Sequence, residues 1–250
     1  MSKKTVEILS KNRAQSLAAL KDKKGRESSG KVILEGVRLM NQLAIYGVYP
    51  EEIYHVAGFD LGSLTVAEAV PSYECKDFQL KRFCDTDSPP KVAGLYPLPT
   101  ASKVAFRKAF YLDRIADPGN LGTIFRLSKA FGMDAILLNE GCAELGSPKV
   151  IRASLGAVYS LPFSYVLPSE LDAESWRIVG TEAAAELRLR SFSLSEGEST
   201  LIVLGSEAHG LSEEVKRRCH QTLSIEMLPE SESINVSVAA GIIAHHLYEL

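Results

Sequence analysis

The chain has 250 residues and a formal net charge of −3, with 46% hydrophobic and 24% charged residues, the values of a soluble globular protein with one large domain or two of ordinary size. It has no apolar run long enough to span a membrane, and no apolar signal segment follows the N-terminal Met-Ser-Lys-Lys-Thr. We therefore expect neither a membrane span nor a signal peptide.

The four cysteines, Cys75, Cys84, Cys142 and Cys219, are scattered along the chain and form no C-x-x-C pair. This spacing favours neither a zinc ribbon nor a disulfide framework. We expect no metal site and a reducing, cytoplasmic location.

The charges are distributed unevenly. Residues 1–40 hold ten Lys or Arg against four Asp or Glu, so this segment carries +6 and the remainder −9. A basic face on an acidic protein can bind phosphates, although charge alone favours the simpler interpretation of a solvated, Lys-rich helix surface.

Residues 1–100 predict a small α/β domain that ends in a linker. The Pro-rich stretches 85–90 and 95–100 are interpreted as that linker, because Pro removes hydrogen-bond donors and favours extended backbone. The predicted elements are a basic helix at 12–24, a break at 28–30, a strand at 32–36, a helix at 37–46 and a strand at 52–56.

Residues 101–250 predict a second domain in which apolar strands alternate with helices. Such alternation is typical of a mostly parallel sheet that is covered on both faces. The predicted strands are 110–115, 135–138, 178–181, 201–204 and 222–225, and the last helix is 236–250.

Three segments of this second domain combine a strand end with a polar or Gly-containing loop. In Asp117–Arg126 (DPGNLGTIFR), Asn120 is expected to cap a helix, and Arg126 lies under two turns further on. In 201–212 a buried strand runs into a Gly-x-Glu-x-x-Gly loop, with Ser212 as the next helix cap. In 225–241 a strand and a polar loop precede a small-residue helix that Asn235 caps. Taken singly, each segment is explained by ordinary capping and packing.

In this order, the three segments resemble the motifs of the SpoU (TrmH-like) family of RNA ribose 2′-O-methyltransferases, of the SPOUT superfamily. The resemblance covers residues 106–250 and includes a further block at 147–157. More loosely, Ser10–Asn12, the basic run to Arg26, Leu34–Arg38 and Asp85–Asp87 resemble the RNA-binding extension of the family, which is similar to a small ribosomal-protein fold. Lys91 stands where the family has Gln.

The resemblance implies a deep trefoil knot, S-adenosylmethionine as methyl donor, a ribose 2′-hydroxyl of structured RNA as acceptor and a homodimer with the site near the subunit interface. The small-residue face of the last helix (Ala239, Ala240, Ile243) fits a close helix contact. The implied cofactor-binding residues are Leu204, Gly205, Gly210, Ile225, Met227, Leu228, Ser233 and Val236.

In the implied mechanism Arg126 activates the hydroxyl, with a substrate phosphate as proton relay, and stabilises the alkoxide. Asn120 positions Arg126 or the ribose, Glu207 orients a neighbouring loop or substrate group, and Ser233 and Asn235 line the site. The implied RNA-binding residues are Lys11, Asn12, Lys21, Lys23, Lys24, Arg26, Arg38 and Arg152.

Three alternatives stay open at this point. Ribosomal RNA of the 23S type is the favoured substrate, and transfer RNA is the alternative. A related SPOUT enzyme that methylates a base nitrogen is a second alternative, against which the 120–126 block argues. A non-catalytic RNA-binding or ribosome-assembly factor with the same fold is the third.

Overall fold

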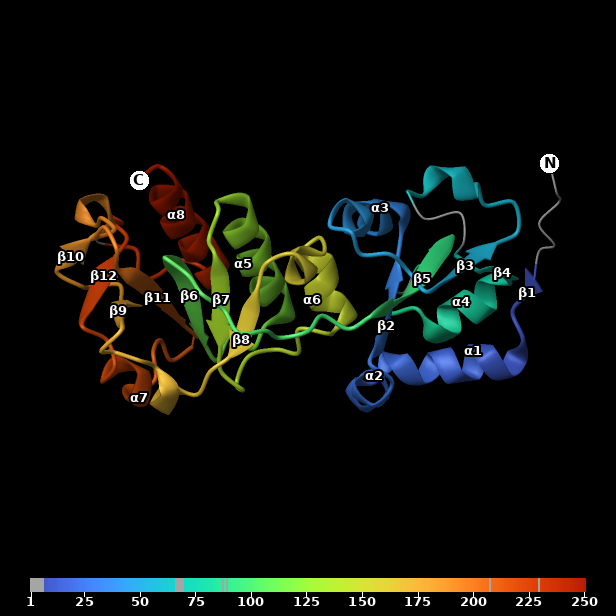
Figure 1. Ribbon diagram of the computed structural model, residues 1–250, viewed down its shortest axis with the longest axis horizontal. Helices are drawn as coiled ribbons and strands as arrows, with labels where there is room; N and C mark the ends of the chain where they lie inside the picture. Colours follow the sequence, from blue (N-terminus) through green and yellow to red (C-terminus); the bar gives the residue numbers. More distant parts are fainter. Residues whose placement is uncertain (1–6, 66–69, 87, 89, 207, 229) are drawn as a thin grey trace. The chain divides into compact units, whose positions relative to one another are not determined.

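The computed structural model describes residues 7–65, 70–86, 88, 90–206, 208–228 and 230–250. Its contacts divide the chain into two compact units (Figure 1). Unit 1 comprises the residues up to Pro99 together with Gly146–Tyr159, and unit 2 comprises Thr100–Leu145 and Ser160–Leu250. The segment 146–159 thus packs with the N-terminal unit, although it lies within the predicted second domain.

Unit 1 is built on a mixed five-stranded sheet of order β1-β4-β3-β5-β2. Strands β1, β4 and β3 are parallel, whereas β5 is antiparallel to both β3 and β2. The strands are β1 Glu7–Ile8, β2 Lys31–Glu35, β3 Glu52–Val56, β4 Ser72–Cys75 and β5 Val92–Pro97, and the helices are α1 Lys11–Ala18, α2 Lys23–Ser29, α3 Val37–Ile45, α4 Asp77–Phe83 and α6 Pro148–Ala153.

The predicted basic helix at 12–24 is split in the structure. Helix α1 begins at a Ser10 cap and continues as a 3₁₀ turn, Ala19–Lys21, after which Asp22 is extended and starts α2. Gly30 ends α2 with φ +68°, so the break predicted at 28–30 is confirmed only at Gly30, because Ser28 and Ser29 are the last residues of the helix.

The linker prediction for 95–100 is wrong for its first three residues, which belong to β5. Strand β5 lies inside the sheet between β3 and β2, and Tyr96 is fully buried. Pro97 is tolerated because it is the last residue of the strand, where a missing N–H interrupts no further ladder.

Unit 2 contains a seven-stranded sheet of order β10-β12-β9-β11-β6-β7-β8, in which every pair is parallel. The prediction of a mostly parallel α/β sheet is therefore confirmed. The strands are β6 Lys108–Asp113, β7 Ala135–Leu138, β8 Phe163–Tyr165, β9 Trp176–Thr181, β10 Leu187–Arg188, β11 Ser199–Gly205 and β12 Gln221–Ser224, and the helices are α5 Pro118–Ala130, α7 Glu213–Lys216 and α8 Val236–Tyr248.

Helices cover both faces of this sheet. Tyr111 and Val203 pack with Val215 of α7 on one face. Because side chains alternate along a strand, their neighbours point to the other face, where α5 and α8 lie side by side (Figure 1). A Cβ on Gly241 would lie 2.9 Å from Leu127 Cδ1, so glycine lets α8 approach α5 closely.

The small-residue face of α8, which was expected to contact a helix of a second subunit, is largely buried within unit 2. Ala240 and Ile243 are both 0% exposed, and Ala239 is partly exposed. Among the described residues, no helix combines the length and the apolar character needed to cross a membrane.

Candidate active site

Unit 2 contains a cavity of about 600 Å³ at the carboxyl edge of its sheet. Three loops line it, those that follow β9, β11 and β12, together with the end of α7 and the first two turns of α8. Parallel strands bring their carboxyl ends to one edge, which is where open α/β sheets bind ligands. The lining residues are Thr181, Glu182, Ala183, Ala184, Leu204, Gly205, Ser206, Gly210, Leu211, Lys216, Leu223, Ile225, Met227, Ser233, Ile234, Asn235, Val236, Ala239 and Ile243.

The loop after β11 is a tight hairpin. Ser206 and Gly210 exchange two backbone hydrogen bonds of 3.1 and 2.8 Å. Gly210 has φ +61°, a conformation that favours glycine. A Cβ on Gly205 would lie 2.3 Å from the carbonyl carbon of Gly210, so only glycine allows the two sides of the hairpin to meet.

Asn235 joins the cavity to the start of α5. Its Oδ1 accepts hydrogen bonds from the backbone N–H groups of Ser237 and Val238 at 2.9 and 3.3 Å, which confirms the predicted cap of α8. Its Nδ2 donates to Oδ1 of Asn120 at 3.0 Å. The first and third sequence segments therefore meet through two amide side chains.

Asn120 does not cap α5, contrary to the prediction. The cap is Asp117, whose Oδ1 accepts from the backbone N–H of Asn120 at 2.8 Å. Pro118 occupies the first helical position, where it needs no N–H. The side chain of Asn120 is thereby free of the capping role and contacts Asn235.

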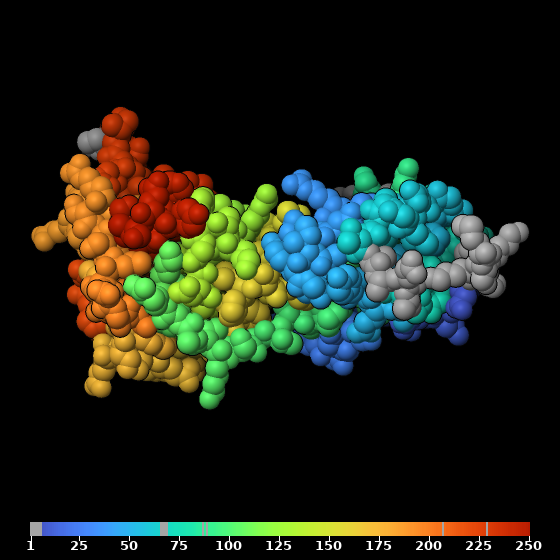
Figure 2. All heavy atoms as spheres, turned by 45° about the horizontal axis from the view of Figure 1, so that its top comes forward, coloured from blue at the N-terminus to red at the C-terminus, as the bar shows by residue number. Residues whose placement is uncertain are grey.

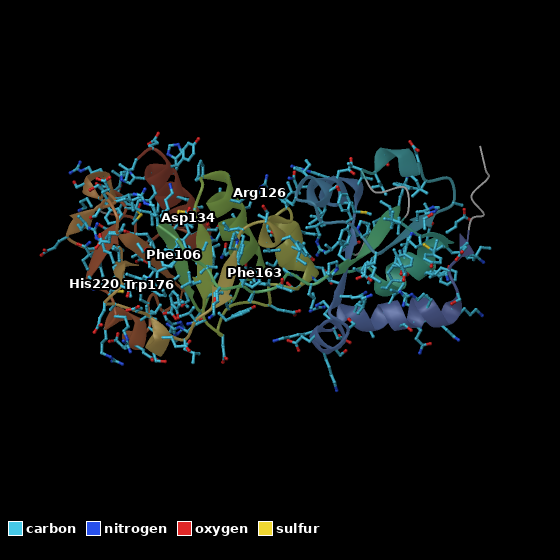
Figure 3. All side chains as sticks on the ribbon, in the orientation of Figure 1. Phe106, Arg126, Asp134, Phe163, Trp176 and His220 are labelled. Carbon is cyan, nitrogen blue, oxygen red and sulfur yellow. The ribbon has the colours of Figure 1, made fainter. Side chains whose placement is uncertain are left out.

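Arg126 lies on α5 and is exposed (Figure 3). It is absent from the cavity lining, and six residues of helix place it about 120° around the axis from Asn120. Of the other predicted residues, Glu207 lies outside the described part of the chain. Leu228 is 68% exposed and does not line the cavity.

The sequence analysis did not identify two charged residues that line the cavity, Glu182 and Lys216. Lys216 Nζ lies 3.3 Å from Glu182 Oε1, and the hydrogen bond with Glu182 raises the pKa of the Lys216 ammonium. Glu182 follows β9, and the rule that ligands bind where parallel strands end could have identified it.

A buried polar cluster lies beneath the hairpin and was also missed. Asp113, the last residue of β6, is 0% exposed. Its Oδ2 accepts from the backbone N–H of Ser212 at 2.6 Å, and its Oδ1 accepts from Asn139 Nδ2 at 2.7 Å and Arg114 Nε at 3.2 Å. No local sequence pattern indicates this cluster, because its members come from three separate segments.

The predicted RNA-binding residues of unit 1 divide into two groups. Lys11, Asn12, Lys21, Lys23, Lys24 and Arg38 are exposed. Arg26 is only 5% exposed, and its Nη1 donates to the backbone oxygens of Leu20 and Lys21 at 3.0 and 2.6 Å. Its guanidinium satisfies the end of the 3₁₀ turn and is not presented to a phosphate.

Arg152 of α6 has carboxylate partners within unit 1. Its guanidinium contacts Glu35 Oε1 at 3.3 Å and Asp85 Oδ2 at 2.7 Å. Glu35 also accepts from the backbone N–H groups of Asp85 and Thr86 at 3.1 and 3.2 Å. Arg152 is thus a structural ion-pair residue, and a direct RNA contact would compete with Glu35 and Asp85.

Comparison with known proteins adds relatives of similar length. Over 98% of this chain and 99% of its own length, 23S rRNA (guanosine(2553)-2′-O)-methyltransferase RlmP of Bacillus subtilis is 26% identical. A tRNA/rRNA methyltransferase of Synechocystis sp., itself uncharacterized, is 30% identical over 93% of this chain and 88% of its own.

Solved structures share the fold. A TrmH-family protein of Porphyromonas gingivalis matches with TM-score 0.83 and 26% identity, over 96% of this chain and 98% of its own. The SpoU methyltransferase AviRb of Streptomyces viridochromogenes, solved with its cofactor AdoMet, matches with TM-score 0.82 and 23% identity, over 96% and 98%.

Two family models account for most of the sequence. Residues 11–94 match the MRM3-like substrate binding domain. Residues 108–245, more than half of the chain, match the SpoU rRNA methylase family, and the chain belongs to that family.

Proposed function

We propose that this protein transfers a methyl group from S-adenosylmethionine to a ribose 2′-hydroxyl of ribosomal RNA. One observation carries the proposal: two of the three sequence segments, 201–212 and 225–241, line one cavity, and the first segment meets it through the hydrogen bond between Asn120 and the lining residue Asn235. The relative RlmP is named for this reaction on 23S rRNA and aligns over nearly the whole of both chains.

The cavity fits the proposed cofactor. Its volume of about 600 Å³ is that of a typical small-molecule site, and its lining is largely aliphatic with a few polar groups. Backbone near Gly205 and Gly210 can approach a ligand closely because no Cβ intervenes. Leu204, Ile225, Met227 and Val236 would surround the adenosine and thioether portions of the cofactor, and Ser233 would offer a hydroxyl.

Bound S-adenosylmethionine would supply a sulfonium methyl group that is open to attack. The chain's own residues must then activate a weak nucleophile, the ribose hydroxyl. The exposed Arg126 guanidinium would bind the substrate phosphate that takes the hydroxyl proton and would stabilise the alkoxide. Asn120, held by Asn235, would orient the ribose at the cavity.

Arg126 does not line the cavity of a single chain. We therefore infer that it reaches the ribose only in a homodimer with RNA bound. Figure 2 shows the C-terminal residues in red at the surface of unit 2. Val238, Ile242 and Tyr248 of α8 are 51%, 40% and 64% exposed and could join a second copy, in place of the buried Ala240 and Ile243. We also propose that the loops around the cavity form a trefoil knot.

Unit 1 is proposed to bind rRNA through its exposed basic residues, since 11–94 match a substrate binding domain. The remaining candidates are Lys11, Asn12, Lys21, Lys23, Lys24 and Arg38. Phosphate contacts of this kind make affinity fall with salt. A cytoplasmic location and action on 23S-type RNA remain predictions.

The test is transfer of labelled methyl from S-adenosylmethionine to unmodified total RNA, by wild type and Arg126→Ala in parallel. We expect label in large ribosomal RNA with wild type only, and nuclease-resistant dinucleotides that place the methyl on ribose. Label in transfer RNA, or on a base, would replace the proposed substrate or reaction. A wild type that neither binds S-adenosylmethionine nor methylates pre-ribosomal particles would support a non-catalytic assembly factor.

A further inference from the structure

The buried cluster at the end of β6 contacts the hairpin at two points that flank a cavity residue. Asp113 is paired in register with Gly205, the first glycine of the hairpin. Its Oδ2 binds the N–H of Ser212, and Arg114 Nη2 donates to the carbonyl oxygen of Gly210 at 3.4 Å. Leu211, between these two contacts, lines the cavity.

Arg114 adopts an unusual backbone conformation to make these contacts. Its φ is +60°, which is rare for a residue with a long side chain and is retained only where the surroundings enforce it. Its N–H donates to Asn139 Oδ1 at 3.0 Å. A Cβ on Gly141 would lie 2.5 Å from Arg114 Cγ, so glycine makes room for the arginine side chain.

The negative charge of Asp113 is compensated by hydrogen-bond donors within unit 2. A fully buried carboxylate is stable only when hydrogen-bond donors surround it, and Asp113 has a backbone N–H, an amide and a guanidinium. Neither Asp113 nor Arg114 lines the cavity. The cluster therefore affects a ligand only through the loop that it holds.

We propose that Asp113 and Arg114 are positioning residues for the methyl donor. They hold Gly210 and Ser212 so that the hairpin presents Leu211 and its backbone to the cofactor. This inference rests on the proposed function. It predicts that disturbing the cluster weakens cofactor binding at a distance, while the residues that line the cavity stay unchanged.

Arg114→Gly is the most informative variant. Glycine accepts φ +60° without strain, and this relaxation of the backbone offsets part of the stability lost when buried Asp113 loses its guanidinium partner, so urea denaturation should show a less stable but folded variant. By isothermal titration with S-adenosylmethionine, we expect Kd to rise about tenfold, the change produced by loss of one charge-assisted hydrogen bond. Arg114→Lys, which keeps the charge, should recover part of that loss. Asp113→Asn should act in the same direction.

Asp134→Asn is the matched control (Figure 3). Asp134 Oδ2 accepts from the backbone N–H groups of Arg107 and Lys108 at 2.8 and 2.9 Å, at the opposite end of β6. The substitution weakens two comparable backbone contacts, because a neutral amide oxygen replaces the carboxylate as acceptor, but it leaves the hairpin untouched. The Kd of Asp134→Asn should equal that of wild type.

Amide hydrogen exchange separates this inference from the proposed function. The N–H of Gly210 donates to Ser206 within the hairpin, so it should exchange faster in Arg114→Gly than in wild type or Asp134→Asn, without any cofactor. Unchanged exchange together with a wild-type Kd would overturn the positioning role. If wild type failed to bind S-adenosylmethionine while exchange still rose, the cluster would hold the hairpin but the proposed function would be wrong.

Discussion

The cofactor-binding residues of unit 2 and the RNA-binding residues of unit 1 were both implied by the family resemblance, but the structure groups the first set at one cavity and divides the second set between the surface and the interior. Seven of the eight predicted cofactor-binding residues line one cavity, and only Leu228 lies outside it. In the basic helices, Lys23 and Lys24 are exposed while Arg26, two residues on, is buried.

The difference has a physical cause. Strand ends in a parallel sheet must meet at one edge, so glycine and polar residues placed after strands converge once the strands form. A run of positive charges carries no such constraint. A side chain in it can point to solvent, or it can bind backbone oxygens as Arg26 does.

The largest effect is expected at Arg126, which lies outside the cavity lining, on the helix whose Asn120 is hydrogen-bonded to the lining residue Asn235. Arg126→Lys keeps the charge and loses the planar fork, so turnover should fall roughly 10²-fold to 10³-fold. The Kd for S-adenosylmethionine should not change. Single-turnover methyl transfer and titration calorimetry measure the two quantities, with Lys129→Ala in the last turn of α5 as the control. Near-wild-type turnover of Arg126→Lys would remove Arg126 from the mechanism.

The next effect tests the hairpin itself. Gly205→Ala places a methyl group 2.3 Å from the backbone of Gly210, and we expect a loss of about 1–3 kcal/mol in the free energy of unfolding, together with loss of cofactor binding. Gly241→Ala is the comparison, because its Cβ would meet only the end of the flexible Leu127 side chain at 2.9 Å. Urea titration of both variants measures the difference. Equal losses of unfolding free energy in the two variants would mean that the hairpin opens easily to accommodate the added methyl group.

Two predicted strands agree with the structure to the residue, whereas β2, β6, β9, β11 and β12 differ from their predicted bounds by one or two residues at an end. The bounds of β3 and β7, Glu52–Val56 and Ala135–Leu138, agree with the prediction because each run is buried and ends abruptly. The short strands β8 and β10, of three and two residues, were missed because so few residues show no period. The second half of strand β5 was interpreted as linker because Pro97 and Pro99 are typical of extended, unpaired backbone, although the residues before them are buried.

The candidate site was predictable where a motif is local and not where it depends on tertiary contacts. Gly205, Gly210 and Asn235 lie in recognisable loops, and their places at the cavity follow from strand order. Asp113 accepts a hydrogen bond from the N–H of Ser212, 99 residues away in the sequence. No pattern in the sequence around either residue predicts this pair. The capping role of Asp117 was assigned to Asn120, because both residue types cap helices and lie three apart.

A smaller effect on folding stability should distinguish the buried Arg26 from the exposed Lys24 of the basic helices. Arg26→Ala leaves the carbonyl groups of Leu20 and Lys21 without this donor, and should lower the free energy of unfolding by about 1–3 kcal/mol. Lys24→Ala, at an exposed position, should change it by less than about 0.5 kcal/mol. Urea denaturation measures both. If Lys24→Ala proved the more damaging to folding, the division of the segment would be wrong.

The smallest effect concerns RNA, where each charge contributes little by itself. Replacing Lys21, Lys23 and Lys24 together by Ala should weaken rRNA binding several-fold and reduce the slope of log K against log salt by about 2–3, because each phosphate contact contributes roughly 0.7–0.9. The matched control replaces Lys81, Arg82 and Lys91, which are also exposed in unit 1 but are not among the proposed contacts. Filter binding at several salt concentrations gives both slopes. Equal slopes in the two triple variants would show that RNA responds to the total charge of unit 1, whereas a loss confined to Lys21, Lys23 and Lys24 would locate the phosphate contacts on the basic helices.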